Sequence, residues 1–424
     1  MPATRVPRAL GWPVRALLFL LGIVLIAAVF VARRGGPGFG RIWAEDGSVF
    51  LADAASADGA WARLQLIVEP SAGQVWLVQR VIADLVVALP VPTWPAAMYL
   101  LACVGAAAAL SVLWQQRGRV VFGPTWWRVV AVGLLALLPA VGEVHGNPAN
   151  LHWWLLASAL VLMTYVAPHT TWGRVLELGY LAVVALTGIS GLILAPIAAW
   201  TLWRRRSRYE VTRAIVVLAG AVVALATVAL SGRAAPLSAY SNVWHLPEVY
   251  LARIGGALTA GSDVVVQCAS TGSYPWVVLA VAGVLMGLVA AVAVLDRAGP
   301  SPWWLLTGVW ALALGLVGSA ELIGWQQTLC STGNGRHIFT ALVTVMLVIF
   351  RALGQGSGWA RVLGGCALAL CALSLIRVET WTSDTDQIAP DDLARFTACL
   401  ERGPGPEQPC VLPVAPQGWE LRVE

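Results

Sequence analysis

Long runs of apolar residues alternate with short polar connections along almost the whole chain. A helix that crosses a bilayer needs about 20 mainly apolar residues, and these runs approach or reach that length. We expect about eleven such helices, within a range of about nine to thirteen because several runs are short. The segments are 14–32, 94–114, 129–141, 151–167, 175–187, 190–203, 214–231, 276–295, 303–322, 337–352 and 361–377.

The composition agrees with this pattern and excludes an ordinary soluble enzyme. Only 12% of the 424 residues are charged and the mean hydropathy is +0.75, whereas soluble domains carry about 25% charged residues. The predicted fold class is therefore an all-α polytopic membrane protein. Every basic residue is Arg, which with 22 Trp is typical of a high-GC bacterial genome. No basic patch with interleaved aromatic residues suggests a nucleic-acid partner.

The distribution of arginine predicts the orientation in the cell membrane. The connections assigned to the inner side hold fifteen Arg, the densest stretch running from Arg204 to Arg213, and only three acids. Basic residues collect on the cytoplasmic side of membrane proteins. The N-terminus is therefore expected in the cytoplasm and the C-terminal tail outside it. The first apolar run lacks a signal-peptide cleavage site and is expected to stay as a helix.

Most of the polar chain then falls on the outer face. Residues 1–377 form the predicted transmembrane domain, with a long first outer loop at about 33–93 and a second at about 231–275. Within the first loop, residues 74–90 are expected to form a helix that lies on, or dips into, the outer leaflet. Residues 378–424 form a Pro-rich, acidic extracytoplasmic tail.

Four of the seven cysteines lie outside the predicted spans, on the side where disulfides are chemically allowed. Four cysteines permit three pairings. Cys399–Cys410 is the easiest closure, and Cys268–Cys330 would join two outer segments. Unpaired thiols are the alternative.

Three outer clusters carry candidate chemistry. Glu45 and Asp46 are adjacent carboxylates beyond the first span, suited to general-base work or metal binding, or else an acidic turn. A polar connector between two spans offers candidate substrate-binding side chains, unless it only caps the next helix; these are His145, Asn147, Asn150 and His152. Arg336, beside His337 at the start of a late span, could hold a phosphate or could simply reach the interface. Arg80 is a further candidate anion contact.

Several short elements resemble those of the GT-C superfamily of membrane glycosyltransferases, and of uncharacterised bacterial proteins with that architecture. Residues Trp43 to Gly47 match a Trp-x-Glu-Asp-Gly element, and Arg336-His337 resembles an Arg-Tyr element at a late span. Further matches are Gln79 to Pro90, Asn150 to Trp153 and Thr187 to Pro196. Gln79, Ile189 and His337 stand where Pro, Pro and Tyr are common.

This resemblance implies a GT-C-like fold and a transferase that uses a polyprenyl-phosphate-linked sugar donor and a cell-envelope glycan, lipid or protein acceptor. Asp46 would then deprotonate the acceptor, with Glu45 assisting or holding Mg²⁺ or Mn²⁺. Arg336, with Arg80 as a second candidate and His337 beside it, would hold the donor phosphate. A transporter or flippase of lipid-linked or small polar solutes, and a non-catalytic membrane scaffold, are the alternatives. The centres of the predicted spans consist almost entirely of Ala, Leu and Val. Ion-coupled transport needs ionisable or polar side chains at that depth, so this composition disfavours it.

Overall fold

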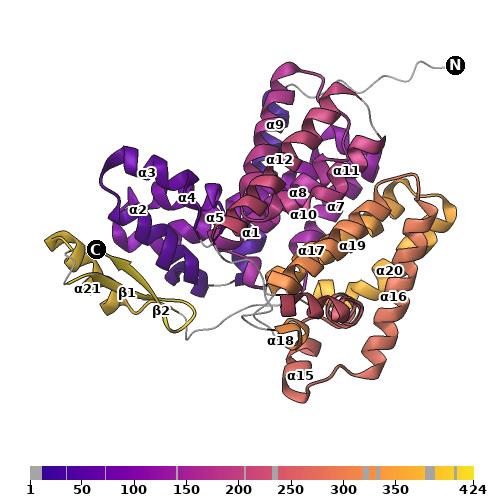
Figure 1. Ribbon diagram of the computed structural model, residues 1–424. Helices are drawn as coiled ribbons and strands as arrows, with labels where there is room; N and C mark the ends of the chain where they lie inside the picture. Colours follow the sequence, from indigo (N-terminus) through magenta and orange to yellow (C-terminus); the bar gives the residue numbers. More distant parts are fainter. Residues whose placement is uncertain are drawn as a thin grey trace.

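A computed structural model describes residues 12–34, 36–71, 73–139, 142–204, 207–231, 237–318, 324–330, 335–377, 387–404 and 408–424. Residues 1–11, with Arg5 and Arg8, lie outside the described residues, as do Arg205, Arg206 and residues 378–386 of the predicted tail. The described chain is mostly helical (Figure 1).

Among the described residues, seven helical segments are long and apolar enough to cross a membrane, which makes the chain an α-helical membrane protein by length and composition. The helices that form them are α1 (Trp12–Arg34), α5 (Trp94–Leu110), α12 (Arg208–Leu230), α16 (Trp276–Leu295), α17 (Ser301–Gly318), α19 (Gly335–Gln355) and α20 (Gly358–Ile376).

The prediction of about eleven spans is therefore not confirmed. The runs 129–141, 151–167, 175–187 and 190–203 fold as shorter helices: α7 (Thr125–Ala136), α8 (Leu151–Leu162), α9 (Thr171–Leu186), α10 (Ser190–Ile193) and α11 (Ala195–Arg204). Helix α8 shows the physical reason, because every one of its residues is buried. Its apolar side chains are covered by other helices rather than by lipid, so hydropathy alone does not distinguish it from a spanning segment.

The other helices are short and belong mainly to the loops. They are α2 (Ala52–Ser56), α3 (Gly59–Val68), α4 (Leu77–Val87), α6 (Arg119–Phe122), α13 (Leu246–Val249), α14 (Gly256–Ala260), α15 (Asp263–Thr271), α18 (Gly324–Cys330) and α21 (Pro390–Arg402).

Helix starts follow local sequence signals where a polar side chain precedes an apolar run. The Ser207 hydroxyl accepts a hydrogen bond from the Glu210 backbone N–H and donates to its carboxylate, which begins α12. The side chains of Thr170 and Ser357 likewise accept a backbone hydrogen bond at the starts of α9 and α20. Such caps satisfy backbone donors that have no partner in the first helical turn.

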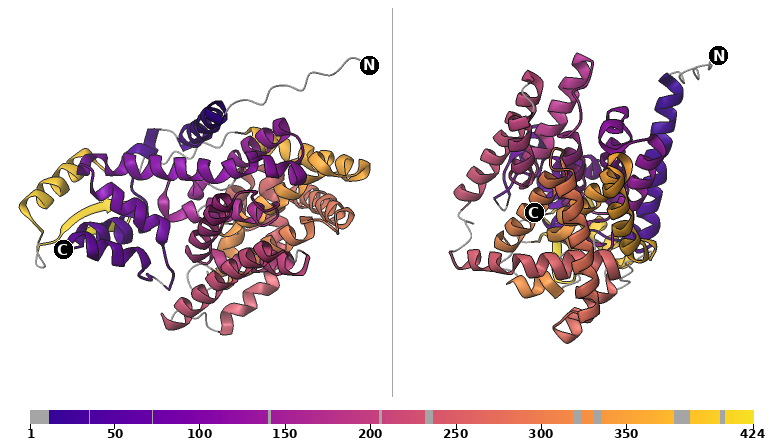
Figure 2. Two further views of the ribbon diagram at one scale, coloured as in Figure 1. Left: turned by 90° about the horizontal axis from the view of Figure 1, so that it is seen from above. Right: turned by 90° about the vertical axis from the view of Figure 1, so that its right-hand side faces the viewer.

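The long helices pack as a bundle, with α17 and α20 on either side of α19, and α16 beside α20. Helix α12 contacts α9, α10 and α11, and α1 contacts α5. Helices α2 to α4 of the first loop and the C-terminal elements lie together at one end of the molecule (Figures 1 and 2).

The C-terminal segment adds one small β-hairpin to a chain that is otherwise helical, in agreement with the predicted all-α class. After α21, strands β1 (Cys410–Val414) and β2 (Trp419–Val423) form an antiparallel hairpin in which Cys410 opposes Val423. A disulfide between Cys399 and Cys410 joins α21 to β1. A second disulfide, Cys268–Cys330, joins α15 to α18. These are the two pairings that the sequence singled out, and the described part of the tail is a small folded unit.

The ion pairs agree with a division of the chain into two faces. Glu177 binds Arg117 and Arg213, and Asp296 binds Arg351 through both carboxylate oxygens; all five residues belong to the predicted inner side. The residues assigned to the outer side also pair among themselves: Arg80 with Asp53, Arg63 with Asp84, and Arg336 with Glu45 and Glu143.

This division makes the orientation testable with single cysteines. Arg297 in the exposed α16–α17 connection and Glu420 in β2 are assigned to opposite faces. In a chain that also carries Cys366→Ala, a membrane-impermeant maleimide applied to intact cells should label Glu420→Cys and should label Arg297→Cys only after permeabilisation. The reverse pattern would show that the assigned orientation is inverted.

Candidate functional site

The Glu45–Asp46 pair lies where the chain turns from the end of α1 into the first loop. After a short 3₁₀ turn at Gly36–Gly40, Asp46 begins a π-helical turn, Asp46–Leu51. A carboxylate at the start of a helical turn is favoured because the first backbone N–H groups point toward it. Asp46 is almost fully buried, and its Oδ1 accepts a hydrogen bond from the Ala149 backbone N–H at 2.6 Å.

The connector at residues 142–150 brings that amide to Asp46, and its asparagines build its shape. The Asn147 side chain accepts a hydrogen bond from the Asn150 N–H at 2.9 Å and donates to the Glu143 carbonyl at 2.7 Å. The side-chain amide of Asn150 also donates a hydrogen bond to the Glu143 carbonyl, at 3.1 Å. Asn147 and Asn150, predicted to bind substrate, thus hold the loop that orients Asp46.

Arg336 lies between two glutamates. Its Nη1 is 3.6 Å from a Glu45 carboxylate oxygen and 3.4 Å from a Glu143 carboxylate oxygen. Its backbone N–H donates to the other Glu143 oxygen at 3.4 Å. The first loop, the connector and the start of α19 therefore meet at one point. The sequence analysis did not select Glu143, because nothing in its local sequence indicates a contact with Arg336.

The two histidines nearest this point are His337 and His152. The Arg336 Nε donates to His337 Nε2 at 3.5 Å. His152 Nδ1 is 2.8 Å from the Ala149 carbonyl, so Nδ1 carries the proton and Nε2 is the acceptor nitrogen. Gln79 lies beside the same carbonyl, with its Nε2 3.4 Å away. His152 thus shares the turn that binds Asp46.

His145 faces the other way, into the core behind the site. Its Nε2 is 3.1 Å from Arg33 Nη1 at the end of α1, and its ring packs against Phe30 and Trp154. Arg33 also donates to the carbonyls of Ala136 and Leu138. The structure therefore gives His145 contacts that tie α1 to the connector.

Arg80 is not brought together with Arg336. It lies on α4 and pairs with Asp53 at 2.9 Å. Burial raises the pKa of Asp53, and the neighbouring guanidinium of Arg80 partly opposes that rise. This pair joins α4 to α2 within the first loop, apart from Arg336.

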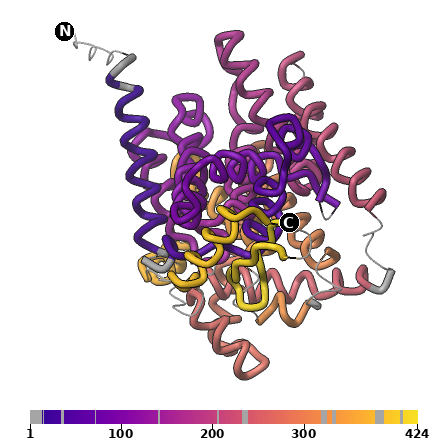
Figure 3. Tube along the Cα trace, turned by 90° about the vertical axis from the view of Figure 1, so that its left-hand side faces the viewer, coloured from indigo at the N-terminus to yellow at the C-terminus, as the bar shows by residue number. Residues whose placement is uncertain are grey.

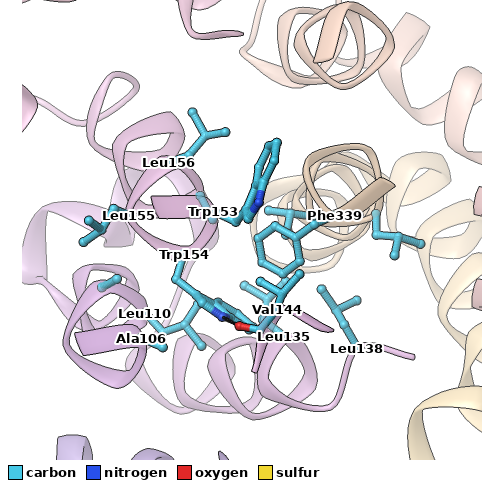
Figure 4. Packing of buried hydrophobic residues seen from close by; sticks show 14 of the residues in the cluster. Ala106, Leu110, Leu135, Leu138, Val144, Trp153, Trp154, Leu155, Leu156 and Phe339 are labelled. Atoms are coloured by element: carbon cyan, nitrogen blue, oxygen red, sulfur yellow. Dashed lines mark hydrogen bonds between the residues drawn. The ribbon is translucent and has the colours of Figure 1, made fainter. Parts of the chain in front are cut away.

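The packing of α8 against α19 fixes the position of the connector relative to Arg336. The Trp154 indole N–H donates to the Val144 carbonyl at 3.1 Å, and the Phe339 ring lies edge-on to Trp154 with centroids 4.6 Å apart. Figure 4 shows Trp153 and Trp154 on α8 directed toward Phe339 and Val144. Because Phe339 follows Arg336 by less than one helical turn, this contact places Arg336 opposite the connector.

The C-terminal hairpin supports the acidic motif from the other side. Ala415 donates its N–H to the Ile42 carbonyl at 2.9 Å and accepts a hydrogen bond from the Ala44 N–H. A Cβ on Gly47 would lie 2.9 Å from the Val414 side chain, so only glycine fits without a shift there. Figure 3 shows the C-terminal trace lying against the segments of the first loop.

A small, partly open pocket adjoins Asp46. Its lining includes Arg41, Trp43, Tyr99 and Asn147. The Arg41 guanidinium lies over the Trp43 ring at 4.9 Å, a cation–π contact. Sequence reasoning did not select Arg41 or Tyr99, because neither belongs to a recognisable motif.

The arrangement does not fit a resident metal ion. Glu45 faces Arg336 while Asp46 faces the Ala149 amide, so the two carboxylates do not converge. Among the described residues, no group of three or more His, Cys, Asp or Glu side chains could hold a metal. No step of the reaction therefore depends on the Mg²⁺ or Mn²⁺ that the resemblance implies.

The chain matches no protein-family model, and no curated protein matches it.

Gly146 provides a test of the site's packing. Its φ is +69°, and a Cβ there would lie 2.3 Å from the Tyr99 ring. We expect Gly146→Ala to lower the free energy of unfolding by about 1–3 kcal/mol, from backbone strain and overpacking. Thermal unfolding in detergent would show a lower Tm. Gly133→Ala, on α7 where nothing lies within 4 Å, is the matched control and should leave Tm nearly unchanged; an equal loss in both variants would contradict the explanation.

Proposed function

We propose that this protein is a membrane glycosyltransferase of the GT-C type, which transfers a sugar from a polyprenyl-phosphate-linked donor to an acceptor of the cell envelope. The observation that carries the proposal is a buried, oriented carboxylate, Asp46, directly next in the chain to Glu45, which joins Arg336 and Glu143 in one cluster. These groups come from three segments far apart in the chain: the first loop, the connector before α8 and the start of α19.

Asp46 is the proposed general base. The Ala149 amide holds Oδ1 at 2.6 Å, which orients the carboxylate. The acceptor hydroxyl transfers its proton to this carboxylate while its oxygen forms a bond to the anomeric carbon of the donor sugar. The bond between that carbon and the phosphate oxygen breaks, and the electron pair leaves with the polyprenyl phosphate. A positioned base of this kind contributes about 10²–10⁴-fold to the rate.

Arg336 is the proposed contact for the donor phosphate. Its distances to Glu45 and Glu143, 3.6 and 3.4 Å, are longer than those of charge-assisted hydrogen bonds. Its side chain is 31% exposed, so a phosphate can replace these contacts without first extracting a buried cation. A guanidinium can bind phosphate through two parallel N–H groups, and its charge stabilises the leaving phosphate. Arg80 is the weaker candidate because it is already bound to Asp53.

The proposed location is the cell membrane, with a cytoplasmic N-terminus and the site and tail on the extracytoplasmic face. A lipid-linked donor diffuses within the bilayer and can approach such a site from the side. The alternatives of a transporter or flippase and of a scaffold predict no chemical change in the donor.

Asp46→Asn should reduce sugar transfer by at least about 100-fold, because an amide keeps the contact with Ala149 but cannot accept the proton. Membranes containing the chain would be incubated with a panel of radiolabelled polyprenyl-phosphate monosaccharides and envelope acceptors. Asp58→Asn, an exposed carboxylate in the same loop, is the matched control. Undiminished transfer by folded Asp46→Asn would remove Asp46 from the mechanism, whereas donor movement across proteoliposomes without chemical change would favour a flippase.

Arg336→Gln should raise the donor concentration needed for half-maximal rate by about 10–100-fold, equivalent to the roughly 1.5–3 kcal/mol of a hydrogen bond to a charged group. Arg336→Lys keeps the charge between Glu45 and Glu143 but loses the planar fork, so its loss should be smaller. Arg377→Gln, which breaks an exposed pair with Asp263, is the control and should leave donor dependence unchanged. Equal donor dependence in all three variants would contradict the assignment.

A further inference from the structure

Helix α4 in the first loop exposes only apolar side chains, although two polar side chains are buried. Its buried residues are Gln79, fully enclosed, and Arg80, only 5% exposed, together with Ile82, Ala83 and Val86. Its exposed residues are Val81 and Leu85, with Leu85 58% exposed. A helix at a water-facing surface directs its apolar stripe toward the core.

Helix α3, which packs against α4, has the same character. None of its residues is buried. Trp61, Leu64 and Val68 are 71%, 56% and 63% exposed, and their spacing of three and four residues places them on one face.

The charged side chains of this pair of helices are bound in ion pairs. Arg63 on α3 lies 3.6 Å from Asp84 on α4, each 35% exposed, and the buried Arg80 pairs with Asp53 on α2. The exposed residues of α3 and α4 include no charged side chain; they are Gly59, Ala60, Trp61, Leu64, Gln65, Val68, Val81 and Leu85. An apolar surface of this kind is a region from which water is normally excluded.

We propose that α3 and α4 form a helical hairpin embedded in the outer leaflet, with the apolar face of both helices against lipid. The sequence suggested an interfacial position for residues 74–90 alone; the structure adds α3 and shows which face of each helix is directed outward. With 10 and 11 residues the helices are too short to cross a bilayer, which takes about 20 residues. They therefore lie at the depth of the headgroup and acyl boundary.

The apolar face of α3 and α4 lies next to a membrane-length helix. We therefore expect lipid, rather than a second copy of the chain, to cover this face. Helix α4 packs on α5, whose Leu100 and Val104 are themselves exposed and apolar. The surface formed by α3 and α4 thus extends an apolar surface that a spanning helix already presents to lipid. Because the partly exposed Arg63 and Asp84 neutralise each other, the pair of helices presents no net charge from them, and insertion should not require anionic lipid.

Spin labels test this placement without any assay of transfer. The full-length chain with Cys366→Ala would be labelled at Leu64→Cys or Leu85→Cys and reconstituted into phosphatidylcholine vesicles, with or without one-quarter phosphatidylglycerol. Collision of the label with oxygen, which concentrates in lipid, would be compared with collision with a water-soluble nickel chelate. Glu420→Cys, on the exposed face of β2, is the aqueous reference.

We expect oxygen collisions to exceed nickel collisions at both hairpin positions in both lipid compositions, and the opposite at Glu420→Cys. Nickel access equal to that at Glu420→Cys would overturn the proposal. Low access to both reagents together with spin–spin broadening would also overturn it, by showing that a second copy covers the face. Should either variant fail to fold, Trp61→Cys and Val81→Cys probe the same two faces.

Discussion

The hydrogen bond from the Ala149 amide to Asp46 is the interaction on which the arrangement of the site depends. It joins two segments 103 residues apart and is fully buried. A hydrogen bond to a charged group contributes about 1.5–3 kcal/mol, and loss of one partner leaves a buried charge uncompensated. The asparagines of the connector, the support of α8 by α19 and the strand pairing of Ala415 all act to keep this amide and this carboxylate opposite each other.

The sequence was informative where the signal is local. Apolar runs predicted the seven membrane-length helices, and the Trp43–Gly47 and Arg336–His337 elements marked two segments that meet in the structure. The rule that arginine collects on one side assigned Glu177 and its arginine partners to the same side, and Asp296 and Arg351 likewise, and each acid contacts those arginines in the structure. Four cysteines outside the predicted spans can form three different sets of two disulfides. The structure contains the set that includes the short closure Cys399–Cys410, together with Cys268–Cys330.

Long-range packing determines what the sequence did not predict. Nothing near Glu143 indicates that an arginine on α19 will approach it, and nothing near His145 indicates Arg33 at the end of α1. Helix α8 has the hydropathy of a spanning segment but is enclosed by protein on every side. The hairpin at Cys410–Val423 was missed because two short strands in a Pro-rich segment form only where they find a partner surface, here provided by residues 42–44.

The contact between Ala415 and residues 42–44 has a consequence for synthesis of the chain. The acidic motif emerges from the ribosome soon after the first helix, but the segment that pairs with it is made only after all seven membrane-length helices of the described chain. A nascent chain can therefore insert these helices while the motif still lacks its supporting segment. Assembly of the site waits for the synthesis of Ala415, so a chain interrupted before residue 410 would carry Asp46 and Arg336 without the support that holds the motif in place.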